Sequence, residues 1–156
     1  MKIEFLFLGK TKESYLAAGI SDYAERLSHY VRLEIRELKD RGRKNNRPVP
    51  EIIEAEGRLL LQAKMKSSLL VALDRCGRML SSEELAQRIR IWEGRGTKGL
   101  TFVIGGPLGL SRAVVRQADF ILSFSRMTFT HEIARFILVE QLYRAFTINA
   151  GGRYHK

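Results

Sequence analysis

The sequence predicts an α/β fold: a mostly parallel sheet with helices on both faces, within one domain spanning residues 1–156. Short apolar runs of strand length alternate along the chain with longer stretches whose apolar residues follow helical spacing. The apolar runs are nearly continuous, which is typical of strands buried on both faces of a parallel sheet. A chain of 156 residues is also long enough to bury a core without disulfides or metals.

The first part of the chain predicts two strands around one helix. IEFLFL at 3–8, closed by Gly9, is an apolar and aromatic run that indicates a buried strand. Apolar residues three and four positions apart predict a helix over 14–29. VRLEIREL at 31–38 alternates apolar with charged residues, so we expect a strand with one exposed face.

A strongly basic segment, KDRGRKNNRPVP at 39–50, comes next. Its glycine, asparagines and prolines disfavour regular structure, so we expect a basic loop. A helix resumes near Pro50, because proline is tolerated in a first turn, and runs to about Lys64. SLLVALD at 68–74 then predicts a second buried strand.

The remaining chain continues the alternation of helix and strand. SSEELAQRIRIWEG at 81–94 opens with serines that can cap a helix and with acids suited to its first turn. LTFVIGG at 100–106 predicts an apolar strand, and SRAVVRQA at 111–118 predicts a short helix capped by its serine. DFILSFS at 119–125 predicts a last strand, and THEIARFILVEQLYRAF at 130–146 predicts the final and most apolar helix.

The charge balance points to a polyanionic partner. Lys and Arg number 27 against 17 Asp and Glu, which gives a formal net charge of +10 and a pI near 10.1. For a cytoplasmic protein the expected polyanion is nucleic acid, and the alternative is a basic surface that serves only solubility. A membrane is disfavoured, because no apolar run reaches the length of a span and no segment combines a basic with a strongly apolar face.

Cysteine and metal chemistry are also restricted. The single cysteine, Cys76, cannot form an internal disulfide, so a reducing cytoplasm is expected, and nothing marks its thiol as activated. HEIAR at 131–135 imitates the zinc motif H-E-x-x-H, but Arg135 stands at the second ligand position. With one Cys and three scattered His, we expect no metal site.

The segment VIGGPLGLS at 103–111 carries the strongest signal for a ligand site. It lacks both the G-x-G-x-x-G spacing after the first strand and a Walker lysine, so a phosphate cradle is disfavoured. A tight turn and a wall that approaches a flat ligand both remain open. Ligands of open α/β sheets bind beyond the carboxyl ends of strands. Three such ends stand out, at 73–77, 105–109 and 123–129.

The final predicted helix has more apolar surface than one sheet requires. Apolar residues cover well over half its circumference, so we expect a second buried face formed with another subunit. Glu140 and Arg144 are spaced i,i+4 and predict an ion pair on a solvated face of this helix.

VIGGPLGLS, LSFSRMTFTHEIARFILVEQLYRAF and the terminal RYHK together resemble the SPOUT methyltransferases. Within that superfamily the chain is similar to the small branch that methylates N3 of a pseudouridine in 23S ribosomal RNA. MKIEFLFLGK and VALDRCGRMLSSEELA also fit, so the resemblance runs nearly end to end. One departure affects the expected loop shape: the family usually has proline before the histidine, whereas this chain has Thr130 before His131.

The resemblance implies a deep trefoil knot in the C-terminal part of the sheet and a homodimer that binds S-adenosylmethionine. Its substrate would be ribosomal RNA, on the assembled ribosome. The implied cofactor contacts are Leu73, Gly105, Phe124, Ser125, Arg126, Met127, Thr128 and Phe129. These contacts coincide with the three strand ends above, so the glycines are expected to let backbone approach an adenosine.

The resemblance also implies that the C-terminal tail reaches a site at the dimer interface. His155 is then the candidate base for the N3 proton, Tyr154 a positioning group, and Arg135 a support for the uracil oxygens or a phosphate. We expect the RNA to be held by basic residues of the loop and the tail, namely Arg41, Arg43, Lys44 and Arg153.

Two alternatives stay open. A non-catalytic RNA-binding module or ribosome assembly factor would bind RNA without S-adenosylmethionine. A SPOUT enzyme of different target would methylate another RNA position, such as a tRNA ribose or guanine N1, and only the resemblance argues against it.

Overall fold

Five strands form one sheet in the computed structural model, which describes residues 1–39 and 47–155. The strands are β1 (Lys2–Leu8), β2 (Arg32–Leu38), β3 (Ser68–Met79), β4 (Gly99–Ile104) and β5 (Phe120–Ser123). Their order across the sheet is β2-β1-β4-β3-β5, and every neighbouring pair is parallel. The predicted α/β class is therefore confirmed, and the sheet is parallel throughout the described residues.

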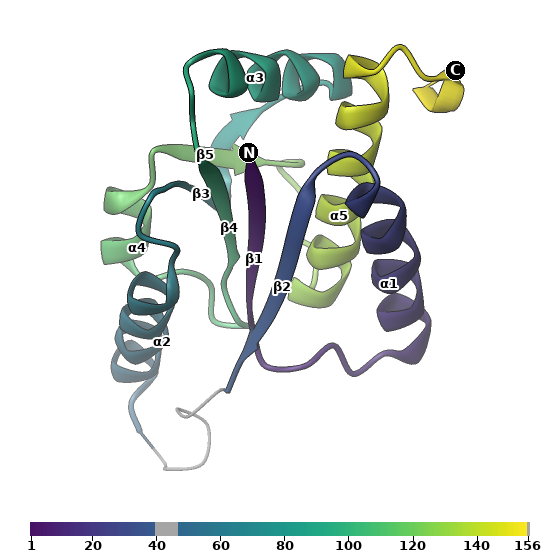
Figure 1. Ribbon diagram of the computed structural model, residues 1–156. Coiled ribbons are helices and arrows are strands. Elements are labelled where there is room, and N and C mark those ends of the chain that lie inside the picture. The colour runs from purple at the N-terminus through teal and green to yellow at the C-terminus, as the bar shows by residue number, and fades with distance from the viewer. Residues whose placement is uncertain (40–46, 156) are drawn as a thin grey trace.

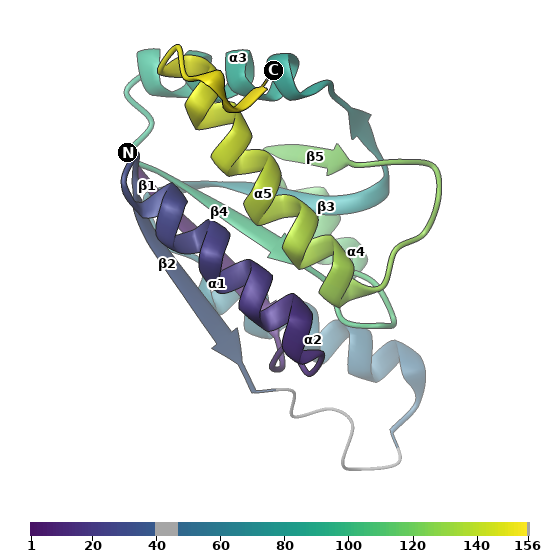
Figure 2. The same ribbon diagram turned by 90° about the vertical axis from the view of Figure 1, so that its right-hand side faces the viewer.

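Helices cover both faces of this sheet (Figure 1). They are α1 (Ser14–Ser28), α2 (Val49–Ala63), α3 (Ser82–Gly94), α4 (Arg112–Gln117) and α5 (His131–Asn149), followed by a short 3-10 turn, η1 (Arg153–His155). α1 and α5 lie on one face with α3 beside α5, while α2 and α4 lie on the other (Figure 2).

The continuous apolar runs follow from this double cover. Along β1, Ile3, Phe5 and Phe7 pack into the core under α1, α3 and α5, whereas Leu6 and Leu8 pack under α2. Successive side chains of a strand point to opposite faces, so a strand covered on both sides needs apolar residues at every position.

The predicted helix starts are confirmed by their capping bonds. The Ser81 hydroxyl accepts the backbone N–H of Glu84, and the Glu84 carboxylate accepts the N–H of Ser81, which is a complete capping box. Ser111 caps α4, and Thr130 caps α5 by accepting the N–H of Ile133. The hydroxyl of Thr130 thus starts the helix at the position where the family usually has proline.

Two elements extend beyond their predicted ends. β3 continues to Met79 instead of ending at residue 74, with an irregular register against β5 between Leu73 and Arg78. Gly77 allows this close crossing, because a Cβ there would lie 2.7 Å from the backbone carbon of Leu122. α5 continues to Asn149, three residues past its predicted end.

The surplus apolar surface of α5 is largely explained within one chain. α5 lies against both α1 and α3, so its flanks are covered as well as its sheet-facing side. Phe136 of α5 packs on Gly19 and Tyr23 of α1, while Gln141 accepts a hydrogen bond from Ser82 of α3. The surplus therefore does not by itself indicate a second subunit, and the dimer stays a prediction. The trefoil knot also stays a prediction.

Candidate active site

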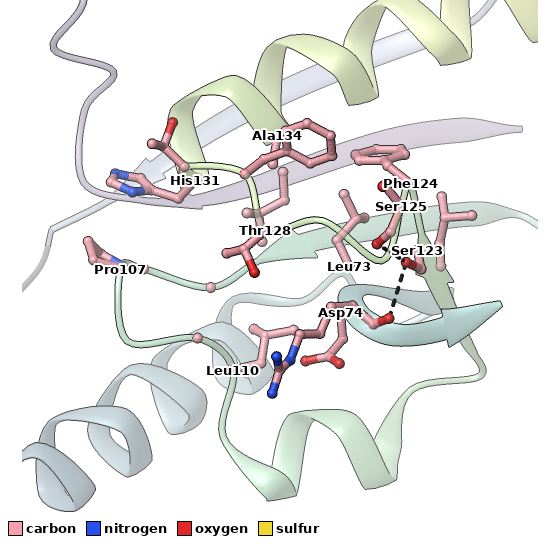
Figure 3. Close-up of a pocket in the computed structure, with 18 of the residues that line it drawn as sticks. Leu73, Asp74, Pro107, Leu110, Ser123, Phe124, Ser125, Thr128, His131 and Ala134 are labelled. Carbon is pink, nitrogen blue, oxygen red and sulfur yellow. Dashed lines mark hydrogen bonds between the residues drawn. The ribbon is translucent and has the colours of Figure 1, made fainter. Parts of the chain in front are cut away.

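A cavity of about 800 Å³ opens at the carboxyl ends of β3, β4 and β5. Its wall comes from residues 73–75, 104–110 and 122–125, and from 127–131 with Ala134. Figure 3 shows Thr128, His131 and Ala134 on one side of it and Asp74 and Leu110 on the other. This is the edge at which parallel sheets bind ligands, and the volume is in the range of small-molecule sites.

The glycine-rich loop closes tightly on itself. A Cβ at Gly105 would lie 2.5 Å from the carbonyl carbon of Gly109, so no side chain fits there. The N–H of Gly109 donates to the carbonyl of Gly106 at 2.9 Å, and Gly109 has φ of +87°. Positive φ thus explains only the last of the three glycines, because Gly105 is needed for close approach between two backbone segments.

A second wall is the loop between β5 and α5, which hydrogen bonds tie to β3. The Ser123 hydroxyl donates to the carbonyls of Arg75 and Ser125 at 3.3 and 3.0 Å (Figure 3). The Ser125 hydroxyl accepts the N–H of Met127 at 3.0 Å. These bonds hold the end of β3 and the loop of residues 124–130 at one rim of the cavity.

Most of the predicted cofactor residues are brought together here. Seven of the eight line the cavity, namely Leu73, Gly105, Phe124, Ser125, Met127, Thr128 and Phe129. Arg126 is exposed and is not among the residues of the wall, so its contact with the cofactor stays a prediction.

Sequence reasoning missed several residues of the wall. Leu110 closes the glycine-rich loop, and His131 stands in the first turn of α5. Asp74 and Arg75 also line the wall; they lie within the predicted strand end at 73–77 but were not among the expected cofactor contacts. Asp74 also accepts the N–H of Cys76 at 2.8 Å. Their position directly after or before the strand ends at 73, 105 and 123 was the available signal.

Arg135 does not face this cavity. Its side chain is fully buried, and its guanidinium donates to the carbonyls of Leu8 and Gly9 and to the hydroxyl of Thr11. Burial lowers its pKa, against the opposing charges of Glu132 and Glu37. The expected contact of Arg135 with the substrate is therefore wrong, because the face of α5 that carries Arg135 packs on the loop between β1 and α1.

The tail packs against its own chain at the other end of α5. The Tyr154 hydroxyl bonds to the Tyr23 hydroxyl at 2.9 Å and donates to Glu140 at 3.0 Å, and its ring lies 4.7 Å from that of Tyr143. Burial, followed by the bonds to Tyr23 and Glu140, raises the pKa of Tyr154 above its ordinary value. The phenol is therefore protonated at neutral pH.

His155 is held by α3. Its Nε2 bonds to the Glu83 carboxylate, which also accepts a hydrogen bond from the Ser81 hydroxyl. The bond from Ser81, then the backbone N–H of Glu83 itself and the bond to His155, lower the pKa of Glu83 to about 2. Within one chain, Tyr154 and His155 thus lie far from the cavity, at the opposite end of α5 (Figure 2).

The predicted Glu140–Arg144 ion pair is confirmed, with Nη2 of Arg144 2.6 Å from Oε1 of Glu140. Its surroundings differ from the expectation, because both side chains are half-buried and Arg144 lies 4.6 Å from the ring of Tyr154. The pair belongs to the support of the tail and is not part of a freely solvated face.

The remaining predictions concern RNA, metals and membranes. Arg153 is exposed, whereas Arg41, Arg43 and Lys44 lie outside the described residues. Within 1–39 and 47–155, no group of three or more His, Cys, Asp or Glu side chains is arranged to hold a metal ion. No helix among the described residues is long and apolar enough to cross a membrane.

Comparison with known proteins identifies the family. A family pattern described as "Predicted SPOUT methyltransferase" matches residues 1–155. The chain is 50% identical to "Ribosomal RNA large subunit methyltransferase H" of Desulfotalea psychrophila and 47% identical to the protein of the same name from Clostridioides difficile. It is 46% identical to a "Putative ribosomal RNA large subunit methyltransferase H" of Methanoregula boonei. In each case the match covers 100% of both chains. This protein belongs to the SPOUT methyltransferase family.

Proposed function

We propose that this protein uses S-adenosylmethionine to methylate N3 of a pseudouridine in 23S ribosomal RNA, on the assembled ribosome. The observation that carries the proposal is the cavity formed by three strand ends, whose wall contains seven residues that the family resemblance assigns to the cofactor. Relatives that match along their whole length are named as methyltransferases of large-subunit ribosomal RNA. A ribosomal substrate implies a cytoplasmic enzyme.

The cavity suits S-adenosylmethionine better than a phosphate-rich ligand. Among the described residues, its wall contains one arginine, Arg75, and no lysine. Leu73, Leu110 and Phe124 offer apolar surface for an adenine ring, and the tight loop at 105–109 offers backbone N–H and C=O groups. Asp74 adds a carboxylate beside the apolar wall, which favours a ligand with positive charge.

The bound cofactor would supply a methyl group on a cationic sulfur, which is a strong electrophile. The side chains of the protein would then have to hold the uracil ring near that methyl group and accept the proton from N3. His155 is the proposed proton acceptor, with its ring oriented through Nε2 by Glu83. Tyr154, a neutral donor fixed by Tyr23 and Glu140, is the proposed positioning group.

These roles require two copies of the chain, because His155 and the cavity of one protomer lie at opposite ends of α5. The cavity rim supports a homodimer: Met127, Phe129 and Leu108 expose 74%, 38% and 39% of their surface around its mouth. Exposed apolar side chains gathered at one site indicate a protein interface. We therefore propose that the tail of one protomer completes the cavity of its partner.

RNA binding follows from the charge. The net charge of +10 on 156 residues attracts the phosphate backbone of RNA to the protein surface as a whole. Arg153 is exposed next to the tail residues, which supports its proposed contact with RNA. Arg41, Arg43 and Lys44 stay proposed RNA contacts from the sequence.

The direct experiment is mass mapping of 23S ribosomal RNA from a strain that lacks the gene, with a calorimetric titration of S-adenosylmethionine into the purified protein. We expect loss of one methyl group from a pseudouridine and stoichiometric cofactor binding. RNA binding without cofactor binding would instead indicate a non-catalytic assembly factor, and a methyl group lost from another nucleotide would change the target.

A further inference from the structure

The first turn of α5 lines the cavity with one face and contacts the loop between β1 and α1 with another. Thr130, His131 and Ala134 contribute to the wall of the cavity. Glu132 and Arg135, spaced three residues apart, point instead into the loop of residues 9–13 between β1 and α1. One helical turn therefore contacts both the cavity and a loop from the opposite end of the sequence.

Arg135 binds the first half of that loop. Its Nη2 donates to the carbonyl of Leu8 at 2.6 Å, and its Nη1 donates to the carbonyl of Gly9 and the hydroxyl of Thr11, both at 3.1 Å. Gly9 has φ of +73°, a conformation that favours glycine. The guanidinium also lies 4.8 Å from the ring of Phe7.

Glu132 binds the second half. Its Oε2 accepts the backbone N–H groups of Lys12 and Glu13 at 2.9 and 3.0 Å. Glu13 is the N-cap of α1 and its own side chain makes no capping bond, so a carboxylate from α5 serves the start of α1. Burial alone would raise the pKa of Glu132, but the bonds from Glu13 and Lys12 outweigh it and the pKa lies below its usual range.

Burying an arginine side chain has a large desolvation cost. Arg135 is fully buried, and among the described residues no carboxylate forms an ion pair with it. Taking a guanidinium out of water costs more than burying an apolar side chain of similar size, so stability alone does not explain it. A fork of several fixed N–H donors does define position and orientation closely.

We propose that Glu132 and Arg135 are positioning residues that clamp the β1–α1 loop to the first turn of α5 and so hold the cavity wall at Thr130, His131 and Ala134 in its cofactor-binding shape. The inference rests on the proposed function, since it names S-adenosylmethionine as the ligand. Supporting residues of this kind act through the wall and do not touch the ligand.

The test is calorimetric binding of S-adenosylmethionine to Arg135→Lys and Glu132→Ala at a temperature well below unfolding, with melting temperatures measured in parallel. We expect the Kd to rise roughly tenfold in both, the scale seen when groups that orient ligand-binding residues are lost. Glu132→Gln keeps a side-chain oxygen that can accept the N–H groups of Lys12 and Glu13, so this variant should retain most of the affinity for S-adenosylmethionine. Hydrogen exchange should be faster at residues 9–13 and 128–134 in the weakened variants.

Leu142→Ala is the matched control, because Leu142 is fully buried in the core and lies two turns, roughly 12 Å, beyond the wall residue Ala134 along α5. It should lower the melting temperature while leaving the Kd within about twofold of wild type, since distant sites act independently. If Arg135→Lys and Glu132→Ala behaved like this control, the clamp would be a stability device only and the proposal would be overturned.

Two outcomes separate the clamp from the proposed function. Equal binding by all variants overturns the clamp and leaves the function intact, whereas no binding by the wild-type protein overturns both. Should Arg135→Lys and Glu132→Ala fail to fold, Thr11→Val removes a single acceptor of the clamp and carries the test. Faster exchange at 128–134 with weaker binding supports the clamp, and unchanged exchange and binding overturn it.

Discussion

The two ends of α5 differ in chemistry as much as in position. The end at His131 borders a cavity walled mainly by backbone, small residues and apolar side chains, with Asp74, Arg75 and His131 as its titratable groups. The end at Asn149 leads to a tail that is held by hydrogen bonds to the carboxylates of Glu140 and Glu83. Nineteen residues of helix separate them, which at 1.5 Å per residue is roughly 28 Å. The proposed cofactor cavity and the proposed proton acceptor His155 therefore lie too far apart to meet within one chain.

The largest expected effect comes from breaking the cavity end alone. Gly105→Val should abolish S-adenosylmethionine binding, because a Cβ at this position meets the backbone of Gly109 at 2.5 Å and the loop cannot close. The circular dichroism spectrum should stay near that of wild type. Gly94→Val, where an added side chain meets open space, is the control that should bind normally. Normal calorimetric affinity in Gly105→Val would show that the loop does not shape the ligand site.

Breaking the tail end should give the opposite result. Truncation after Gly152 removes four residues, and none of those that the structure describes lines the cavity. The affinity for the cofactor should therefore survive. Methyl transfer to ribosomal RNA, followed with labelled S-adenosylmethionine, should fall by about 10²-fold or more, the usual scale for a lost acid–base group. A truncated protein with wild-type turnover would remove His155 from the mechanism.

The smallest effect concerns the contact that holds the tail on α3. The pKa of Glu83 is lowered from 4.5 to about 2, first by the Ser81 hydroxyl and then by its backbone and His155. A lowered folded-state pKa stabilises the protein above pH 4.5, and this contribution is lost as the pH falls towards 2. The melting temperature of wild type should therefore fall more steeply over this range than that of Glu83→Gln, and the two curves should converge.

Glu93→Gln, at the far end of α3, is the control for this titration. Its melting curve should run parallel to that of wild type in the same window. A constant difference between wild type and Glu83→Gln from pH 5 to pH 2 would mean that the carboxylate of Glu83 is not held by Ser81 and His155 in solution.

Sequence periodicity predicted the sheet and its helices because both faces of each inner strand are buried and the helix caps carry local signals, as at Ser81 and Ser111. It also predicted the three strand ends that form the cavity. The extension of β3 was missed, because Arg75, Gly77 and Arg78 have the composition of a loop and pair only through an irregular register with β5. The direction in which Arg135 points depends on how α5 packs, which local sequence does not encode.

Mixing the two disabled forms tests the central claim most directly, namely that one site is built from two copies. Gly105→Val chains keep an intact tail, and chains truncated after Gly152 keep an intact cavity. Each form alone should show about a hundredth of the wild-type methyl transfer or less. Refolding them together in equal amounts should restore methyl transfer to about a quarter of the wild-type level, because half of the dimers would be mixed and each would hold one complete site. A mixture as inactive as its two components, with mixed dimers demonstrated by mass spectrometry, would contradict a site shared between protomers.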